Sequence, residues 1–438
     1  MNIPKTTKSR AANNTAPLPK LPPLSVEIDS ALSFDQAVEE LKYLFFSHWS
    51  LVRVIAGTII RIPEIETKVF LAHSLFLHAE IAGATRRRLV ELRVRDSKLC
   101  VIPQIISAVC NELLYSDSAA EFVFGYSALV AHLAETQSQY IQRTSHLLDR
   151  PSVLIMRRFA PDIVEVTDWL ETARSAYVAI DFESQFFETH ITAILKSRSS
   201  DGCPSPMLRQ DSREPYQRTN ECARDGRFAL FHQSRQYSTS DGLHQLPDDK
   251  YGVDRLELAR VQRDEIDAIE TFANVLFDLD DAPFELVEQL ARFVEDEARH
   301  VETGHAILAN LGHDPFEIPC SIIGINVRAP MPPVLAFAQL NIFGELNIVS
   351  RLNVMAQQAY ARDDDLIGKA FDFVHADELT HVRRGRKLLI DMAPGENPAD
   401  VSETARRLAA RRLAEEGVLG EDYALALTRK QVGELMGE

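Results

Sequence analysis

The sequence predicts an all-α protein with a four-helix bundle in its second half and a second, amino-terminal helical domain. Three observations support this fold class. Apolar residues recur at three- and four-residue intervals over long segments, prolines and polar turns separate these segments, and the second half divides into two helical hairpins. Two domains are expected because a single hydrophobic core rarely grows beyond about 250–300 residues, and this chain has 438.

The composition changes along the chain and divides it into five segments. Residues 1–24 are rich in Pro, Thr, Asn and Lys and lack the apolar core of a secretion signal, so we expect a flexible tail. Residues 34–196 have the helical pattern of the amino-terminal domain. Residues 197–250 lose this periodicity and predict an irregular connection, which at that length is often a functional lid or disordered. Residues 251–392 hold the bundle, and residues 393–438 are expected to form a carboxy-terminal helical extension.

The sequence of the amino-terminal helical domain contains no recognisable catalytic or metal-binding motif. Its helices are expected to be separated at four prolines, Pro63, Pro103, Pro151 and Pro161. Five side chains of metal-binding type lie on these helices: His48, His73, His78, Glu80 and Glu135. No Glu-x-x-His pair accompanies them, so core or surface roles are favoured over metal ligation, which needs several convergent ligands.

The composition also argues against several kinds of partner and compartment. The chain has 64 acidic and 47 basic residues and a net charge of −17, so its field repels nucleic acids and anionic membranes. No apolar run approaches the roughly 20 residues needed to span a bilayer. The five cysteines are scattered and form no Cys-x-x-Cys pair, which is typical of a reducing compartment. We therefore expect a soluble cytoplasmic protein without nucleic-acid or membrane partners.

The second half contains the motif Asp-Glu-x-x-His twice, on two predicted helices. The first copy places Glu297 and His300 on a helix over 284–311, and the second places Glu378 and His381 on the last helix of the bundle. A spacing of three puts Glu and His about 60° apart on one helix face, so both side chains can reach the bundle axis. Each of these helices follows a partner helix, over about 253–278 and from about 334.

Carboxylates on the two partner helices lie at matching heights. Residues equidistant from the turn of an antiparallel hairpin share a height because each helix rises about 1.5 Å per residue. With the first turn near 281, Glu265 and Glu297 are each 16 residues from it, and Glu345 and Glu378 straddle the second turn equally. Glu270 is the alternative to Glu265, but five residues move it about 7.5 Å along the helix and rotate it about 140° away. It is interpreted as structural or as a neighbour of the ligands.

These positions define a ligand set for two metal ions. One Glu from each of two helices and Glu-x-x-His from each of the other two is the arrangement of di-iron and di-manganese carboxylate bundles. Four carboxylates neutralise two divalent ions, and one imidazole per metal leaves positions open for dioxygen. The ligand types fit iron, and they do not rule out a manganese-iron pair. The alternative is four unrelated acidic helices whose Glu and His side chains face water.

Residues 253–390 resemble the ferritin-like superfamily. The blocks RDEIDAIE, EDEARHVETGHAILANLGHDPF and ADELTHVRRGRKLL are similar to those of an uncharacterised bacterial ferritin-like family. The resemblance implies a di-iron site with six ligands: Glu265, Glu297, His300, Glu345, Glu378 and His381. In the oxygen-activating members, an Asp before the ligating Glu bonds the His on the opposite helix, which implies Asp296 for His381 and Asp377 for His300. Some di-iron N-oxygenases carry one more His about a turn before this Glu, so His375 is a candidate extra ligand.

The resemblance and the ligand set predict an O2-activating di-iron oxygenase or oxidase. Its substrate is expected to be a small organic molecule, with dioxygen as co-substrate. No nucleotide-binding glycine motif appears, so a separate reductase is the expected electron source, and a homodimer is compatible with these features. The alternatives are a ferritin-type ferroxidase that stores iron and a scaffold in which metal ions only pin the helices. Gly304 and Gly344 lie beside the ligands, and each suits either space for a substrate or close helix packing.

Overall fold

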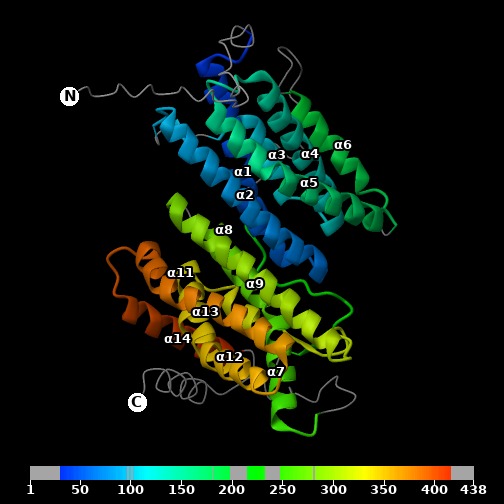
Figure 1. Cartoon of the computed structure of the whole chain (residues 1–438), viewed down its shortest axis with the longest axis vertical. Helices are drawn as coiled ribbons and strands as arrows, with labels where there is room; N and C mark the ends of the chain where they lie inside the picture. The colour runs from blue at the N-terminus through cyan, green and yellow to red at the C-terminus, as the bar shows by residue number, and fades with distance from the viewer. Residues whose placement is uncertain are drawn as a thin grey trace, which may run out of the picture.

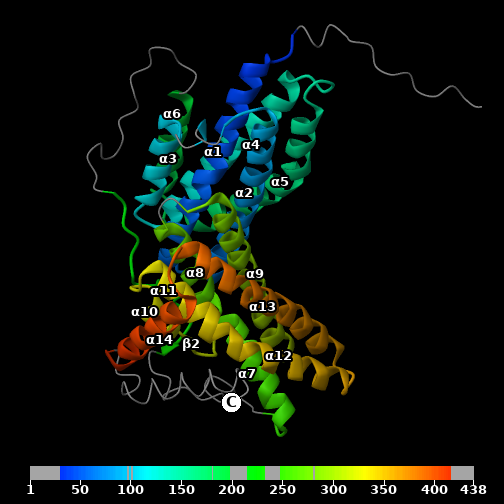
Figure 2. The ribbon, with the colours of Figure 1, turned by 90° about the vertical axis from the view of Figure 1, so that its left-hand side faces the viewer.

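The protein is all-α, as predicted. The computed structural model describes residues 30–95, 98–99, 102–179, 181–197, 215–231, 247–279 and 282–415, and the predicted tail at 1–24 lies outside them. Within the described residues, β-structure is confined to one short parallel pair, β1 (Leu230–Phe231) with β2 (Cys320–Ser321). Figure 1 and Figure 2 show the helices in two groups that meet at α8 and α9.

The described part of the amino-terminal half contains six α-helices. They are α1 (Phe34–Thr58), α2 (Ile65–Glu91), α3 (Gln104–Leu114), α4 (Ala119–Arg143), α5 (Arg150–Val178) and α6 (Gln185–Lys196), with a 3-10 turn at Ile59–Arg61. Side-chain caps begin two of them: Ser33 forms a capping box with Gln36, and the Ser118 hydroxyl accepts the Glu121 N–H.

Proline separates these helices at three of the four expected positions. Pro63 lies between α1 and α2, Pro103 precedes α3, and Pro151 lies in the first turn of α5. Pro161 is inside α5, so the prediction of a helix boundary there is wrong. The helix continues because Phe159 and Ile163 are both buried, whereas Pro161 is exposed. Packing on either side of the proline therefore outweighs the backbone hydrogen bond that it removes.

The second half contains the two predicted hairpins, with an interruption in the first helix of each. The helices are α7 (Lys250–Asp264), α8 (Ile266–Asp278), α9 (Phe284–Asn310), α10 (Ile323–Arg328), α11 (Pro333–Ala338), a π-helical turn (Gln339–Gly344), α12 (Glu345–Tyr360), α13 (Asp365–Met392) and α14 (Pro398–Glu415). The helix predicted over 253–278 breaks at Glu265. The helix predicted from 334 contains the π-helical turn just before Glu345. Such π-helical turns occur frequently at functional sites.

One hydrophobic cluster spans both groups of helices, and a second lies within the second half, among α7, α9, α12 and α13. Helix α2 packs against α9, and α1 packs against α8, and their buried apolar residues form one continuous cluster. In Figure 1, α8 and α9 lie between the amino-terminal helices above and α12 and α13 below. The amino-terminal helices therefore cover one side of the first hairpin, and the second hairpin lies on the other side.

The described part of the 197–250 connection lies along both groups of helices. Ala223 N donates to Ile60 O (2.9 Å) in the 3-10 turn that follows α1. Arg218 Nε donates to Asp278 Oδ2 (2.9 Å) at the end of α8, and β1 pairs with β2. Residues 215–231 therefore tie the amino-terminal helices to the first hairpin.

Among the described residues, one helical segment is long and apolar enough to cross a membrane. It covers Phe34–Arg61, and 89% of its most apolar window is buried inside the protein. The expectation that no segment reaches this length is therefore wrong. Core helices of soluble proteins pass the same test, and the burial of this segment is compatible with a soluble protein.

Candidate metal centre

The six predicted ligands lie on four separate segments of the second half. Glu297 and His300 are on α9, and Glu378 and His381 are on α13, each pair three residues apart on one helix face. Glu265 lies at the break between α7 and α8, and Glu345 follows the π-helical turn as the first residue of α12. Both single carboxylates thus come from a point where the helix is distorted, and both Glu-x-x-His pairs come from regular helices.

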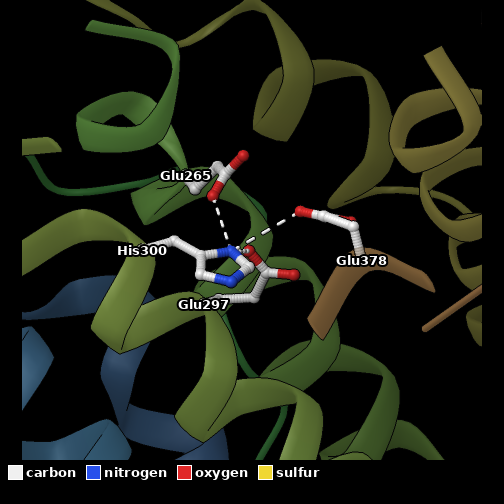
Figure 3. A group of neighbouring side chains, drawn as sticks. All are labelled: Glu265, Glu297, His300 and Glu378. Atoms are coloured by element: carbon white, nitrogen blue, oxygen red, sulfur yellow. Dashed lines mark hydrogen bonds and ion pairs between the residues drawn. The ribbon is translucent and has the colours of Figure 1, made fainter. Parts of the chain in front are cut away.

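His300 lies among three carboxylates, and together they form the first group (Figure 3). Its Nδ1 atom is 2.9 Å from Glu265 Oε2, 3.3 Å from Glu297 Oε2 and 3.5 Å from Glu378 Oε1. One ligand atom from each of these four residues lies within 4.8 Å of the others. This group is therefore able to hold a metal ion.

His381 belongs to a second group with Glu297 and Glu345. Its Nδ1 atom is 3.3 Å from Glu297 Oε1 and 3.5 Å from Glu345 Oε1. Ligand atoms of the three residues again lie within 4.8 Å of one another. Glu297 belongs to both groups and turns one oxygen toward each histidine, so the two groups adjoin.

The six side chains are largely removed from solvent, which makes their charges costly. Glu297, His300, Glu378 and His381 are at most 1% exposed, and Glu345 and Glu265 are 6% and 15% exposed. Burial raises the pKa of Glu265 to about 8, and burial with the charges of neighbouring carboxylates raises the pKa of Glu378 well above its usual range. Isolated buried carboxylates are expensive, so this arrangement requires protons or cations.

The surroundings of the two histidines and of Glu297 favour the charged form of each side chain. Burial alone would lower the pKa of each imidazole, but Glu265 beside His300 and Glu345 beside His381 raise it well above the usual value. Burial opposes the ionisation of Glu297, yet the two imidazoles beside it lower its pKa to about 2. The charge of each side chain in the centre therefore depends on the charges of its neighbours. A cation bound there would displace protons from these side chains.

Several buried ligand atoms have no hydrogen-bond partner within the described residues. They include Glu297 Oε1, Glu345 Oε1, Glu378 Oε2 and His381 Nδ1. Buried polar atoms are normally paired, so this cluster of unpaired atoms fits metal ligation well. Four carboxylates and two imidazoles also match the charge and donor types that a pair of divalent iron or manganese ions takes.

The two aspartates of the repeated motif lie beside the far nitrogens of the histidines. Asp296 Oδ2 is 3.2 Å from His381 Nε2, and Asp377 Oδ2 is 3.5 Å from His300 Nε2. Each aspartate and its histidine are on different helices, α9 and α13. Carboxylates in this position fix the tautomer and orientation of ligating imidazoles. The Asp296 contact has hydrogen-bond geometry, and the Asp377 contact is longer.

Arg299 links the two aspartates and was not predicted from the sequence. Its Nη2 atom donates to Asp377 Oδ2 (2.9 Å) and also to Asp296. Its positive charge reduces the repulsion between these two carboxylates, which come from different hairpins. The spacing of three residues from Asp296 on one helix was the only signal for this role in the sequence.

Asn341 is a second residue that the sequence did not reveal. It lies in the π-helical turn, fully buried, and its Nδ2 atom donates to Glu345 Oε2 (2.6 Å) and to His381 O (3.2 Å). Gly385 on α13 leaves the space for it, because a Cβ atom there would lie only 1.5 Å from Asn341 Oδ1. The distorted turn thus brings an amide to the ligand that follows it.

Two other candidates are not part of either group. His375 is half-buried on α13 and contributes no atom to the two ligand groups found among the described residues. Glu270 is fully buried but faces the amino-terminal helices, where it pairs with Lys68 and with Arg224 Nη1 (2.5 Å). Glu270 therefore joins α8 to α2 and to the 215–231 segment.

The amino-terminal candidates also have partners of their own. His48 Nδ1 is 2.9 Å from His78 Nδ1, and burial lowers the pKa of His48 to about 3 and that of His78 well below its usual value. His73 contacts Glu295 and Glu302 of α9, Glu80 is half-buried, and Glu135 is exposed. Core and surface roles describe these residues, as expected.

A cavity of about 510 Å³ opens onto the ligand carboxylates. Its walls include Glu265, Glu297, Glu345 and Glu378, so a molecule in the cavity would touch the candidate metal centre. Gly344 also lines it, and a Cβ atom there would meet only Leu340 Cδ1, at 3.2 Å. Its lack of a side chain thus leaves space beside the ligands.

Gly304 permits close helix packing, which is the second of the two roles that the sequence allowed. A Cβ atom at this position would lie 2.3 Å from Arg263 N and 2.4 Å from Ala259 O, both backbone atoms of α7. Gly304 therefore permits close packing of α9 on α7, which positions Glu297 and His300 relative to Glu265.

Comparison with known proteins finds no matching family model, no similar curated protein and no similar solved structure. What the geometry establishes is an all-α protein with two adjoining groups of Glu and His side chains that are able to bind metal ions.

Proposed function

We propose that this protein is an O2-activating di-iron oxidoreductase of ferritin-like architecture, an oxygenase or oxidase of a small organic substrate. The observation that carries the proposal is Glu297, which turns one carboxylate oxygen toward each of two histidines. A carboxylate shared in this way suits a bridge between two metal ions. A single ion would leave one of the two groups as buried, uncompensated carboxylates.

The cavity favours catalysis over a purely structural metal pair. A structural site is expected to be closed by protein ligands, whereas a catalytic site keeps an accessible position. Here the cavity reaches four of the six candidate ligands and has partly apolar walls, which include Val261, Leu340 and Ile348. Such a lining suits an organic molecule better than hydrated iron in transit to a store.

Residues that surround the proposed centre would hold and orient the side chains that bind the metal ions. Asp296 bonds His381 Nε2 and would orient that imidazole, and Asp377 lies 3.5 Å from His300 Nε2; each Nδ1 atom faces the carboxylates. Asn341 holds one oxygen of Glu345 and leaves the other directed at His381. Phe293 and Phe272 pack against the His381 ring, with centroids at 4.2 and 6.1 Å, and exclude water from that side.

A reduced iron pair held by these ligands would supply the electrons for the reduction of dioxygen. The sequence contains no nucleotide-binding glycine motif, so we propose that a separate reductase returns the electrons. The same donor types also suit a manganese-iron pair.

The proposal is tested by anaerobic loading with ferrous iron followed by a pulse of oxygen. We expect about two irons per chain and oxygen consumption in proportion to the iron bound, at a rate that candidate organic substrates change. Stopped-flow absorption and an oxygen electrode measure both. Deposition of many more irons per chain without organic product would favour iron storage. Tight metal binding without any oxygen consumption would favour the structural role, and either result overturns the proposal.

A further inference from the structure

We infer that a small acidic protein that carries single electrons docks on the outer face of α9 and α13, where the histidines of the candidate metal centre come near the surface. The arginine face, as we name this surface, consists of Arg292, Arg299, Phe373, Arg384 and Lys387. The inference rests on the proposed function, and it adds the kind of partner that supplies the electrons and the place where that partner binds.

The two sides of the candidate metal centre contact different parts of the protein. The wall of the cavity includes four of the ligand carboxylates and neither of the two histidines. The Nε2 atom of each histidine faces an aspartate instead: His381 Nε2 is 3.2 Å from Asp296 Oδ2, and His300 Nε2 is 3.5 Å from Asp377 Oδ2. A substrate in the cavity therefore meets the carboxylates, and the histidine side is left for another partner.

Arg299 connects the histidine side of the centre to the protein surface. Its guanidinium group bonds Asp377 Oδ2 (2.9 Å) and also Asp296, and its side chain is 35% exposed. Arg292 is 40% exposed, and its Nη2 atom lies 2.9 Å from Asp296 Oδ1. One aspartate and one guanidinium group thus lie between each imidazole and solvent. Because electron transfer requires close approach, a carrier bound over these arginines is well placed to reduce both metal ions.

Phe373 gives the arginine face an apolar contact point. Among the described residues it is the most exposed large apolar side chain, at 73%. It precedes Asp377 by four residues on α13, so the two share a helix face, and Asp377 in turn bonds Arg299. Aromatic residues and arginines are enriched in protein–protein interfaces and supply much of the binding energy there. The ring therefore suits contact with a folded protein.

A run of basic residues on α13 gives the arginine face a surplus of positive charge. Within the described residues, none of the run's four basic side chains belongs to an ion pair, and all four are exposed: Arg383, Arg384, Arg386 and Lys387. Arg384 lies seven residues after Asp377, on the same face of α13, and its Nη1 atom donates to the neutral Oε1 atom of Gln289 on α9 (2.6 Å). Lys387 follows Arg384 by three residues and lies beside it.

The acidic side chains nearby do not cancel this surplus. Glu285 and Glu288 of α9 pair with Arg86 and Arg87 of α2. Asp391, one turn beyond Lys387, is a single negative charge opposite four positive ones. The whole chain carries a net charge of −17, so an acidic protein is repelled by most of the molecule and attracted here. Such a distribution of charge steers the partner to one face.

The transfer balances with a carrier of single electrons. Two reduced carriers would each lose one electron, two ferric ions would each gain one, and no covalent bond would form or break. Encounters between redox proteins are transient and bury less than about 1,200 Å² in total. A face of one exposed ring and a few basic side chains is therefore sufficient.

The test uses the full chain loaded with ferric iron and, as the probe, a plant-type [2Fe–2S] ferredoxin with a net negative charge. Anaerobic stopped-flow absorption follows the oxidation of reduced ferredoxin, and calorimetric titration with oxidised ferredoxin measures binding. We expect a second-order reaction whose rate falls steeply between about 0.01 and 1 M salt, because the Debye length shrinks from about 30 to about 3 Å. Iron content and the extent of reduction by excess dithionite check that the centre is intact in every variant.

Two variants change the charge and the aromatic ring separately. Arg384→Glu/Lys387→Glu should lower the rate about 10- to 1,000-fold at low salt and much less at high salt. Phe373→Ser should weaken binding about 10-fold or more at every salt concentration. All three side chains are exposed, so both variants should fold. The matched control is Arg150→Glu/Arg157→Glu, which makes the same change of charge at two exposed arginines of α5 and should react much as the unaltered protein does.

Each other outcome overturns the inference in a distinguishable way. Equal losses in the charge variant and in its control mean that net charge alone acts, and unchanged rates in both variants mean that the ferredoxin reacts elsewhere. A chain that sediments as a dimer and dissociates after Phe373→Ser shows that a second copy covers the face. Iron that dithionite reduces but ferredoxin does not removes the inference alone, whereas a chain that binds no iron removes the proposed function as well.

Discussion

The two adjoining ligand groups predict that single substitutions will remove different numbers of metal ions. Glu265 belongs only to the His300 group, Glu345 belongs only to the His381 group, and Glu297 belongs to both. We expect Glu297→Ala to lose most of the metal, while Glu265→Ala and Glu345→Ala each affect one ion. This pattern follows from the positions of the ligand atoms and would not arise from four independent surface carboxylates.

The number of remaining donors sets the size of each effect. The His300 group has four residues and keeps three after Glu265→Ala, whereas the His381 group has three and keeps two after Glu345→Ala. From a starting value of about two irons per chain, Glu345→Ala should retain about one. Glu265→Ala should retain between one and two, with the second ion weakly bound. Glu378→Ala removes a donor of the His300 group and a carboxylate 3.8 Å from His381, so it should lose most of the metal.

Elemental analysis after anaerobic loading and desalting measures this series. Glu285→Ala is the matched control, because Glu285 lies on α9 with Glu297 but its side chain is 72% exposed. Circular dichroism of each metal-free variant checks that the helices persist. Unchanged metal content in Glu297→Ala, or equal losses in all variants including the control, would refute the shared-ligand geometry.

Three further outcomes follow from the structure. Asp296→Asn should weaken metal binding about 10- to 100-fold, because it loses the charge beside the far nitrogen of a ligating imidazole; competition with a chelator measures this. Gly304→Ala should lower the free energy of unfolding in urea by about 3 kcal/mol or more, since its Cβ atom would overlap the α7 backbone. Gly344→Ala should change the same free energy by less than about 1 kcal/mol. For His73, burial lowers the pKa but two glutamates raise it to about 9. Its stabilisation is therefore present below the unfolded value of about 6.5 and lost as pH rises through about 9, and His73→Gln should abolish this part of the pH dependence of unfolding.

The sequence alone determined the helical class and the spacing of each Glu-x-x-His pair on its helix. Within one helix, spacing fixes the face and height of a side chain, so Glu297 with His300 and Glu378 with His381 could be recognised as pairs. Equal distances from a turn selected Glu265 over Glu270, and the structure brings Glu265 into a ligand group and leaves Glu270 in an ion cluster. These inferences need only the local geometry of the α-helix.

The tertiary structure decided the features that depend on packing between distant segments. The helix breaks at Glu265 and changes to a π-helical turn before Glu345, although both stretches have continuous helical periodicity. Pro161 remains inside a helix because buried residues on both sides hold it. Local propensities are worth about 1 kcal/mol per residue, or about 3 for proline, and burial of several side chains exceeds them.

Only the tertiary structure showed which residues surround the candidate centre. Arg299 and Asn341 reach their partners across helices, and Arg260 and Arg351 meet at one cavity from positions 91 residues apart in the chain. An arginine or asparagine on a helix gives no sign in the sequence of which distant carboxylate it will face. The spacing within each helix therefore specified the candidate ligands, while the crossing of α7, α9, α12 and α13 specified what surrounds them, because contact between helices depends on packing that no local pattern records.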